Sequence, residues 1–311
     1  MRRIRFGNGT GGALLAVLLC LLPAGCERKA PKATPPGEGT TGSIRIGLIP
    51  EQNIFRQLER YEPLASHLSK VVGVPIELKI LPRYGNIIAN FQSQQLDGGF
   101  FGSFTYALAH EKIGLEVVAR PMAPDNSSTY HGLIFVRKDR GIRNAGDMRG
   151  KRFAFVDKAT TAGYLLPLNY FHEHGIADYH AYLKESYFAG THEDAIRDVL
   201  EGRADVGAAK NTVFQRLLES DPRIREELVI LERSPSVPEN ALALRKDLDP
   251  ELALRLRDAL LSLQDSPEGR AVLETFRAAR FIPTENRDYD PVFEYARKAH
   301  LDLAGYDYLN D

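Results

Sequence analysis

Residues 151–163 read KRFAFVDKATTAG, an apolar run followed by a turn of small and hydroxylated residues. The run has the length and composition of a buried strand, and it ends at Asp157. From about Gly163 to His174 the apolar pattern predicts a helix. A strand, a short turn and a helix in this order form the repeating unit of an α/β sheet, with the turn at the carboxyl end of the strand.

The same succession recurs along the chain from Ile44 onward, in two series that meet near Tyr130. This alternation predicts an α/β fold with largely parallel sheets, and the two series favour two lobes with a cleft between them. The expected strands are 44–49, 75–81, 98–101, 133–136, 151–156, 187–189 and 204–208. The expected helices begin at Pro63 (ending at Gly73), Asn86, Ser103, Gly163, Thr191 (ending at Gly202), Thr212, Pro250 and Pro267.

The N-terminal residues have the pattern of an export signal. Three arginines within the first five residues precede an apolar run over 13–22, which is too short to span a bilayer. The run ends at Pro23-Ala24-Gly25-Cys26, which is similar to a bacterial lipobox, although Pro23 stands where that pattern usually has leucine. We expect residues 1–25 to be a lipoprotein signal peptide and Cys26 to carry lipid; ordinary cleavage to a soluble periplasmic protein is the alternative.

Residues 26–43 are rich in proline, glycine, threonine and lysine, and they predict a flexible tether between the lipid and the folded part. We therefore expect the protein to be anchored to a membrane at its periplasmic or extracellular face, without spanning it. The full chain has a net charge of −1. Removal of the three arginines in residues 1–25 leaves 37 basic against 41 acidic residues, a net of −4.

Composition and motifs exclude several classes of function. A chain without basic excess is not typical of a nucleic-acid binder. The chain has two cysteines, Cys20 inside the expected signal and Cys26 at its end, so neither a disulfide scaffold nor a thiol nucleophile is expected. The sequence has no His-Glu-x-x-His or Gly-x-Ser-x-Gly motif, and His172 and His174 lie at a spacing that points them to different faces of a helix. We expect neither an enzyme nor a bound cofactor or metal.

Several of the expected strand-to-helix turns carry the same chemistry. Small residues and hydroxyl or amide side chains stand just after a strand and at the start of a helix. The free N–H groups and the positive dipole end of a helix N-terminus favour an anion there. The turns are Phe101-Gly102-Ser103, Ala159-Thr160-Thr161-Ala162-Gly163, Gly190-Thr191-His192 and Lys210-Asn211-Thr212. Their convergence predicts a binding site for a small anion.

The chain resembles the phosphonate-binding family, the substrate-binding components of phosphate, phosphite and phosphonate ABC importers. The resemblance runs in order from about residue 44 to 290. It lies in GLIP (47–50), YEPLA (61–65), FFGSFTY (100–106), FAFVD (153–157), TTAGY (160–164), FAGTH (188–192) and ADVGA (204–208). It implies the two-lobed type II periplasmic binding protein fold with a ligand cleft between the lobes. Lobe 1 would be 44–130 and 236–311, and lobe 2 would be 131–235. The hinge would be near Tyr130-His131-Gly132 and Ser234-Pro235.

The resemblance also implies ligand contacts. Tyr84 would donate its hydroxyl to a ligand oxygen, and Phe101 would give shape without a hydrogen bond. The hydroxyl cradle of the family corresponds to Thr160, Thr161 and Ala162, so the third hydroxyl is lost. His192 matches a histidine near the ligand in the family, with a capping or surface role as the alternative. Ser103 would contribute from lobe 1.

Two further candidates come with open alternatives. Asn53, next to Gln52, follows the first strand, so it can bind a ligand oxygen or cap a helix. Lys210 stands where binders of aminoalkyl phosphonates tend to carry an acid, which disfavours a ligand with an amine; a solvated lysine is the alternative.

The expected function follows from these observations. The protein would be an extracytoplasmic solute-binding lipoprotein that captures phosphate, phosphite or a simple phosphonate by hinge closure. Its partners would be the small anion, a lipid membrane and an ABC permease, and the protein would be a monomer. The alternatives are the same fold binding another small anion, or a ligand sensor for a membrane signalling partner.

Overall fold

The computed structural model describes residues 42–84 and 87–310. The expected signal peptide, Cys26, most of the tether and Asn86 lie outside the described residues. No helix within the described ranges is long and apolar enough to cross a membrane.

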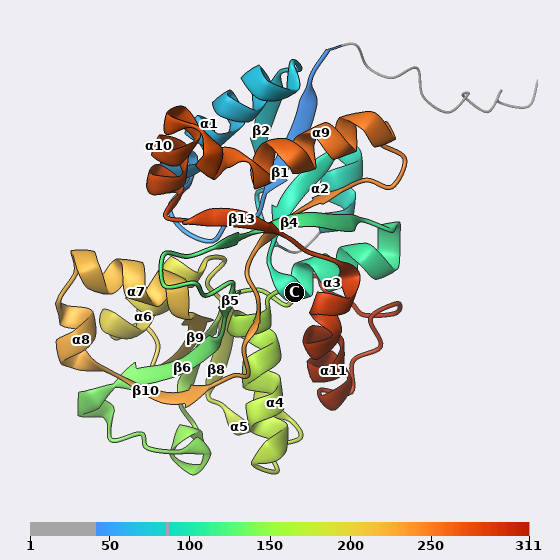
Figure 1. Ribbon diagram of the computed structural model, residues 1–311. Helices are drawn as coiled ribbons and strands as arrows, with labels where there is room; N and C mark the ends of the chain where they lie inside the picture. Colours follow the sequence, from blue (N-terminus) through green and yellow to red (C-terminus); the bar gives the residue numbers. More distant parts are fainter. Residues whose placement is uncertain (1–41, 85–86, 311) are drawn as a thin grey trace, which may run out of the picture. The chain divides into compact units, whose positions relative to one another are not determined.

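The first sheet has six strands in the order β13-β4-β12-β3-β1-β2 (Figure 1). The three strands at one edge are parallel, because β1 pairs in parallel with both β2 and β3. β12 lies between β3 and β4 and is antiparallel to both, and β13 is antiparallel to β4 at the other edge. The bounds are β1 Ile44–Leu48, β2 Ile76–Ile80, β3 Gly98–Phe101, β4 Glu116–Met122, β12 Ala241–Leu244 and β13 Arg280–Pro283.

Helices cover both faces of this sheet. Ile46 and Leu48 point to the face where α1 (Ile54–Val72), α9 (Pro250–Leu261) and α10 (Pro267–Phe276) pack. Ile49 belongs to the core on the other face, with α2 (Ile87–Ser93) and α3 (Ser103–Ile113). Successive strand residues alternate between the faces, as the pleat requires. α11 (Asp290–Lys298) lies against α3.

The second sheet has five strands in the order β10-β6-β9-β7-β8. β7 pairs in parallel with β8 and β9, and β6 is antiparallel to β9 and β10. The strands are β6 Gly132–Arg137, β7 Arg152–Phe155, β8 Glu185–Phe188, β9 Val206–Lys210 and β10 Leu228–Arg233. The helices are α4 Leu166–Glu173, α5 Tyr179–Tyr182, α6 His192–Leu200, α7 Asn211–Ser220 and α8 Arg223–Glu227. Short 3-10 turns occupy Lys138–Arg140, Ala145–Met148, Leu263–Asp265 and Asn286–Tyr289.

Two segments that connect the sheets pair with each other. β5 (Thr129–Tyr130) and β11 (Val237–Pro238) form a two-stranded antiparallel ribbon. The ribbon lies at the two crossings expected to form the hinge. Ser103 Oγ donates to the Pro238 carbonyl at 2.5 Å, so α3 is fastened to the ribbon.

Most of the predicted elements are confirmed, and three details are wrong. The sheets are mixed, because β12 and β6 lie inside their sheets and are antiparallel to both neighbours, whereas βαβ units give parallel strands only. The first helix begins at Ile54, capped by the Asn53 side chain, and Pro63 lies inside it. Lys210 is the last residue of β9, paired with Gly132, because the strand continues two residues beyond 208.

The C-terminal segment connects the second sheet to α3. The Tyr306 hydroxyl donates to the Lys158 carbonyl at 3.0 Å, and the Asn310 amide donates to Asp157 at 2.6 Å. The Tyr306 ring packs against Phe104 of α3. The tail therefore fixes the turn that follows β7.

That turn is unusually tight. Thr161–Leu165 form one π-helical turn before α4, and Leu165 N–H donates to the Thr160 carbonyl. A Cβ atom on Gly163 would lie 2.3 Å from the Val156 Cβ and 2.8 Å from the Thr160 hydroxyl. Only glycine lets the turn pack this closely on the end of β7.

We predict that Gly163→Ala lowers the free energy of unfolding by about 1–3 kcal/mol, because the added methyl overpacks the turn. Gly42→Ala is the control, since a Cβ at Gly42 meets nothing within 4 Å. Urea denaturation followed by circular dichroism measures both variants. Equal stability of the two variants would contradict this account of the turn.

Candidate functional site

The carboxyl-terminal strand ends of the two sheets meet in direct contact. The Phe104 N–H, at the start of α3, donates to Thr161 Oγ1 at 3.0 Å. The Thr105 hydroxyl donates to the Ala159 carbonyl at 2.8 Å. The His192 N–H donates to the Glu51 carbonyl at 3.2 Å. Parallel strands in α/β sheets place their ligand-binding turns at this edge, so the predicted residues converge at one interface.

The two hydroxyls expected to cradle the anion are buried and hydrogen-bonded. Thr161 Oγ1 also accepts from the Tyr130 hydroxyl at 2.9 Å, and Thr160 donates to the Asp157 carbonyl at 2.6 Å. Ala162 is buried at the same turn, against Gly132. The first N–H groups of a helix have no partner inside the helix, so the start of this one supplies backbone donors at the sheet edge.

Tyr84 is the predicted residue with the clearest free bonding capacity. Its side chain is 2% exposed, and its hydroxyl has no hydrogen-bond partner among the described residues. Burial, with Glu51 adding to it, raises the pKa of this hydroxyl well above its ordinary value. Tyr84 therefore stays neutral and holds a proton that an anion can accept.

His192 lies beside Tyr84, with the two ring centroids 6.1 Å apart. Its Nδ1 accepts from the Lys210 N–H at 3.3 Å, which leaves the proton of the neutral ring on Nε2. Burial lowers the pKa of His192 to about 3, with Lys210 and Arg216 opposing its protonation and Glu51 favouring it. The ring is thus a neutral donor at physiological pH.

Lys210 is buried, so the interpretation of it as a solvated lysine is wrong. Its ammonium donates to Glu51 at 3.0 Å, to Asn240 at 2.8 Å and to Glu239. It also lies 4.3 Å from the centre of the Tyr130 ring. Burial alone would lower the pKa of Lys210, but the Glu239 and Glu51 carboxylates more than offset it and raise the pKa above its ordinary value. An ammonium so paired has little charge left for a ligand.

The other predicted residues have mainly structural contacts. Phe101 is fully buried and packs against Phe91. Asn53 caps α1 by accepting from Phe55 and Arg56, which is the capping alternative, and its own N–H donates to Glu193 at 3.1 Å. The Ser103 hydroxyl is used by the ribbon.

Several residues of the site were not predicted. Lys210 is surrounded by Glu51, Tyr130, Glu239 and Asn240. Burial alone would raise the pKa of Glu51, but the charges of Lys210 and Arg216 more than offset it and lower the pKa to about 2. Arg216 of α7 bonds Gln52 through Nε and has a buried Nη2 without a partner among the described residues. The sequence held one signal for Glu51. It is an acid that closely follows the first strand, and the carboxyl end of that strand faces the same interface as the carboxyl end of the strand that Lys210 terminates.

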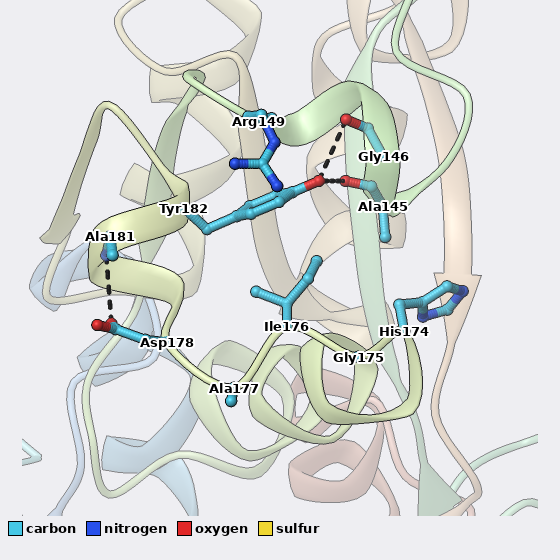
Figure 2. A pocket seen from close by; sticks show the side chains of 10 residues that line it. All are labelled: Ala145, Gly146, Arg149, His174, Gly175, Ile176, Ala177, Asp178, Ala181 and Tyr182. Atoms are coloured by element: carbon cyan, nitrogen blue, oxygen red, sulfur yellow. Dashed lines mark hydrogen bonds between the residues drawn. The ribbon is translucent and has the colours of Figure 1, made fainter.

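A separate pocket of about 420 Å³ lies in the part of the chain around α5 and contains none of the predicted residues (Figure 2). The Arg149 guanidinium covers the Tyr182 ring at 4.4 Å, and the Tyr182 hydroxyl donates to the carbonyls of Ala145 and Gly146. His174 bonds the Tyr170 carbonyl. The Tyr182 hydroxyl and the His174 ring in this pocket thus bond to the protein backbone. The residues described also include no group of three or more His, Cys, Asp or Glu side chains that could hold a metal ion.

The chain is similar to known substrate-binding proteins. A family model described as "ABC transporter, phosphonate, periplasmic substrate-binding protein" matches residues 46–289. The phosphonates-binding periplasmic protein of Escherichia coli (strain K12) is 26% identical over 259 residues, 82% of this chain and 76% of that protein. The phosphate-import protein PhnD of Mycolicibacterium smegmatis is 26% identical over 302 residues, 90% of this chain and 93% of that protein.

The fold is shared with a solved structure. The structure of PhnD1 from Prochlorococcus marinus (MIT 9301) in complex with methylphosphonate has a TM-score of 0.73 and 22% identity, and covers 83% of this chain and 98% of that one. This likeness confirms the two-lobed type II periplasmic binding protein fold.

The pKa of His192 predicts an acid-sensitive fold. The unfolded state takes up a proton near pH 6.5, whereas the folded state resists it down to about pH 3, so stability is complete above pH 6.5 and falls as the pH decreases. The loss is about 1.4 kcal/mol per pH unit for one proton. Glu51 adds a loss of the same sign only below pH 4.5.

We therefore expect His192→Gln to flatten the dependence of unfolding free energy on pH between 6.5 and 4.5. Denaturant titrations at half-unit steps measure it, with His180→Gln, which removes an exposed imidazole, as the control. A slope in His192→Gln as steep as that of the unchanged protein would refute the assignment.

Proposed function

The chain belongs to the family of periplasmic substrate-binding proteins of ABC phosphonate transporters, and from this premise we propose that it captures a small phosphorus oxyanion. The ligand is phosphate, phosphite or a simple phosphonate, and the protein delivers it to an ABC permease. The family consists of transport proteins that bind a substrate without converting it.

One observation carries the proposal: the buried, unpartnered hydroxyl of Tyr84 beside the neutral His192 ring. Both groups are neutral donors and are buried, and a hydrogen bond to an anion is strong in a buried place. The Thr161 hydroxyl, which accepts two hydrogen bonds and keeps its proton, and the backbone that starts the next helix add donors at the same strand ends, and Thr160 lines the turn. Two cations, Lys210 and Arg216, balance the carboxylates of Glu51 and Glu239 nearby.

Binding requires the two sheets to separate and close again. We assign 44–130 and 236–311 to lobe 1 and 131–235 to lobe 2, with the β5–β11 ribbon as the hinge. The closed form is stabilised by two contacts of the Glu193 carboxylate with lobe 1. It accepts from the Asn53 N–H and pairs with Arg56 at 3.7 Å. Phe101 and Ala162 shape the site without donating side-chain hydrogen bonds.

The proposal extends to the location of the protein. Residues 1–25 direct export, Cys26 carries a lipid, and 26–43 tether a monomeric binding protein to a membrane at its periplasmic or extracellular face. Mass spectrometry of the protein from its host membrane tests this, because a lipidated N-terminal Cys26 adds diacylglycerol mass. A cleaved, unmodified N-terminus would show ordinary secretion instead.

A ligand panel tests the function. We expect phosphate, phosphite or methylphosphonate to raise the melting temperature of the purified protein by several degrees, because a ligand that binds only the folded state stabilises it. Sulfate and 2-aminoethylphosphonate serve as the comparison anions. The proposal fails if no phosphorus anion shifts the melting temperature, and sulfate alone would indicate a different anion.

Tyr84→Phe tests the site itself. Loss of one hydrogen bond to a charged ligand weakens binding by about 1.5–3 kcal/mol, or roughly 10- to 100-fold. Stability stays nearly unchanged, because the hydroxyl has no partner in the described protein. Isothermal titration calorimetry compares it with Tyr289→Phe, a fully buried tyrosine that packs against Tyr106. Equal affinity in both variants would remove Tyr84 from the site.

A further inference from the structure

The side chains around the Lys210 ammonium form a complete receptor for a primary amine. Glu51, Glu239 and Asn240 supply three oxygen acceptors, at 3.0 Å from Glu51 and 2.8 Å from Asn240. The ring of Tyr130 supplies an aromatic face 4.3 Å away. A primary ammonium has three N–H donors and a charge that an aromatic face attracts, so each of its bonding capacities is matched.

The receptor and its occupant come from different parts of the fold. Glu51 follows β1, Tyr130 ends β5, and Glu239 and Asn240 lie between β11 and β12, so none belongs to the second sheet. Lys210, which brings the ammonium, ends β9 of the second sheet. These four receptor residues therefore form a binding site on one side, and the second sheet inserts a side chain into it.

The charges of the group indicate that an ammonium is needed there. Two carboxylates bond to one ammonium, and the charge of Lys210 makes the largest contribution to lowering the pKa of Glu51 to about 2, with smaller ones from Arg216 and Arg60. Both Glu51 and Lys210 are less than 5% exposed, so the pair is shielded from bulk solvent. A buried carboxylate that loses the cation bonded directly to it is strongly destabilising.

Tyr130 connects this receptor to the predicted anion site. Its ring contacts the ammonium, while its hydroxyl donates to Thr161 at 2.9 Å. The two sites are thus separated by the length of one tyrosine side chain. A ligand carrying both a phosphonate and an amine would compete with the Lys210 side chain for the receptor.

We propose that Lys210 is a specificity-determining residue: it fills an ammonium subsite with a tethered ammonium, so the protein accepts phosphorus oxyanions that lack an amine. The occupation of the subsite is independent of the ligand. The selection among ligands rests on the proposed function, in which the anion binds at Thr160 and Thr161.

Chemical rescue tests the subsite without any phosphorus ligand. Lys210→Ala leaves a cavity lined by two carboxylates, so its melting temperature falls by several degrees or more. Ethylammonium, which matches the end of the lost side chain, restores several degrees with a saturating dose response. Ethanol and sodium at equal concentration do not. Two controls are expected to show no specific effect of ethylammonium on the melting temperature: the unchanged protein and Lys246→Ala. The side chain of Lys246 is 76% exposed.

Two further variants keep the test decisive. Lys210→Met removes the charge but fills the space, so ethylammonium has no room and rescue is absent. If Lys210→Ala does not fold, Lys210→Ala/Glu239→Gln carries one carboxylate fewer and takes its place, with rescue expected at higher amine concentration. Absence of rescue in both alanine variants, or rescue in Lys210→Met as large as in Lys210→Ala, overturns the proposal.

Calorimetry then measures the selection. We expect methylphosphonate to bind the unchanged protein more tightly than 2-aminoethylphosphonate, and Lys210→Ala to shift the ratio of the two affinities at least tenfold toward the amine. Rescue by ethylammonium with no phosphorus anion bound by either protein would keep the subsite and refute the proposed function. Normal phosphonate binding with neither rescue nor a shifted ratio would refute the subsite alone.

Discussion

The buried ion pair between Lys210 and Glu51 joins the last residue of a strand in one sheet to the segment after a strand in the other. Removing one partner of such a pair costs about 3–5 kcal/mol, because the remaining charge has neither water nor a counter-ion. The strand ends must therefore meet with Glu239 and Asn240 in register. This requirement fixes where the turns that carry Thr160, Thr161 and His192 lie, since they start at the same sheet edges.

Pairing of the charges leaves the recognition of an anion to neutral donors. Tyr84 keeps its proton because burial raises its pKa, and His192 stays neutral because burial lowers its pKa to about 3. Neutral donors suit a compact oxyanion, because several short, charge-assisted hydrogen bonds offset the cost of its transfer from water. The family to which the chain belongs binds solutes of this chemical class outside the cytoplasm.

The strands β1 to β3 and β6 to β9 were predictable because they depend on local pattern. The motifs in order along the chain placed Tyr84, Thr160, Thr161 and His192 at the ends of these units, and their contact with a ligand stays a prediction. The predicted start of α1 at Pro63 was wrong, because the Asn53 side chain caps the helix and the helix begins at Ile54. The burial of Lys210 was not predictable either. Its partners lie 159, 29 and 30 residues away, at distances that no local pattern encodes.

The sequence by itself determined the α/β class, the order of the elements and the small, hydroxylated turns at the strand ends, because hydrophobic periodicity and turn chemistry act over a few residues. The tertiary structure decided which side chains share the interface. Glu51, Glu239 and Asn240 became an ammonium receptor, and Lys210 became its occupant, only when the ribbon brought the two sheet edges together. Electrostatic pairing depends on distance in space, which separation along the chain does not reveal.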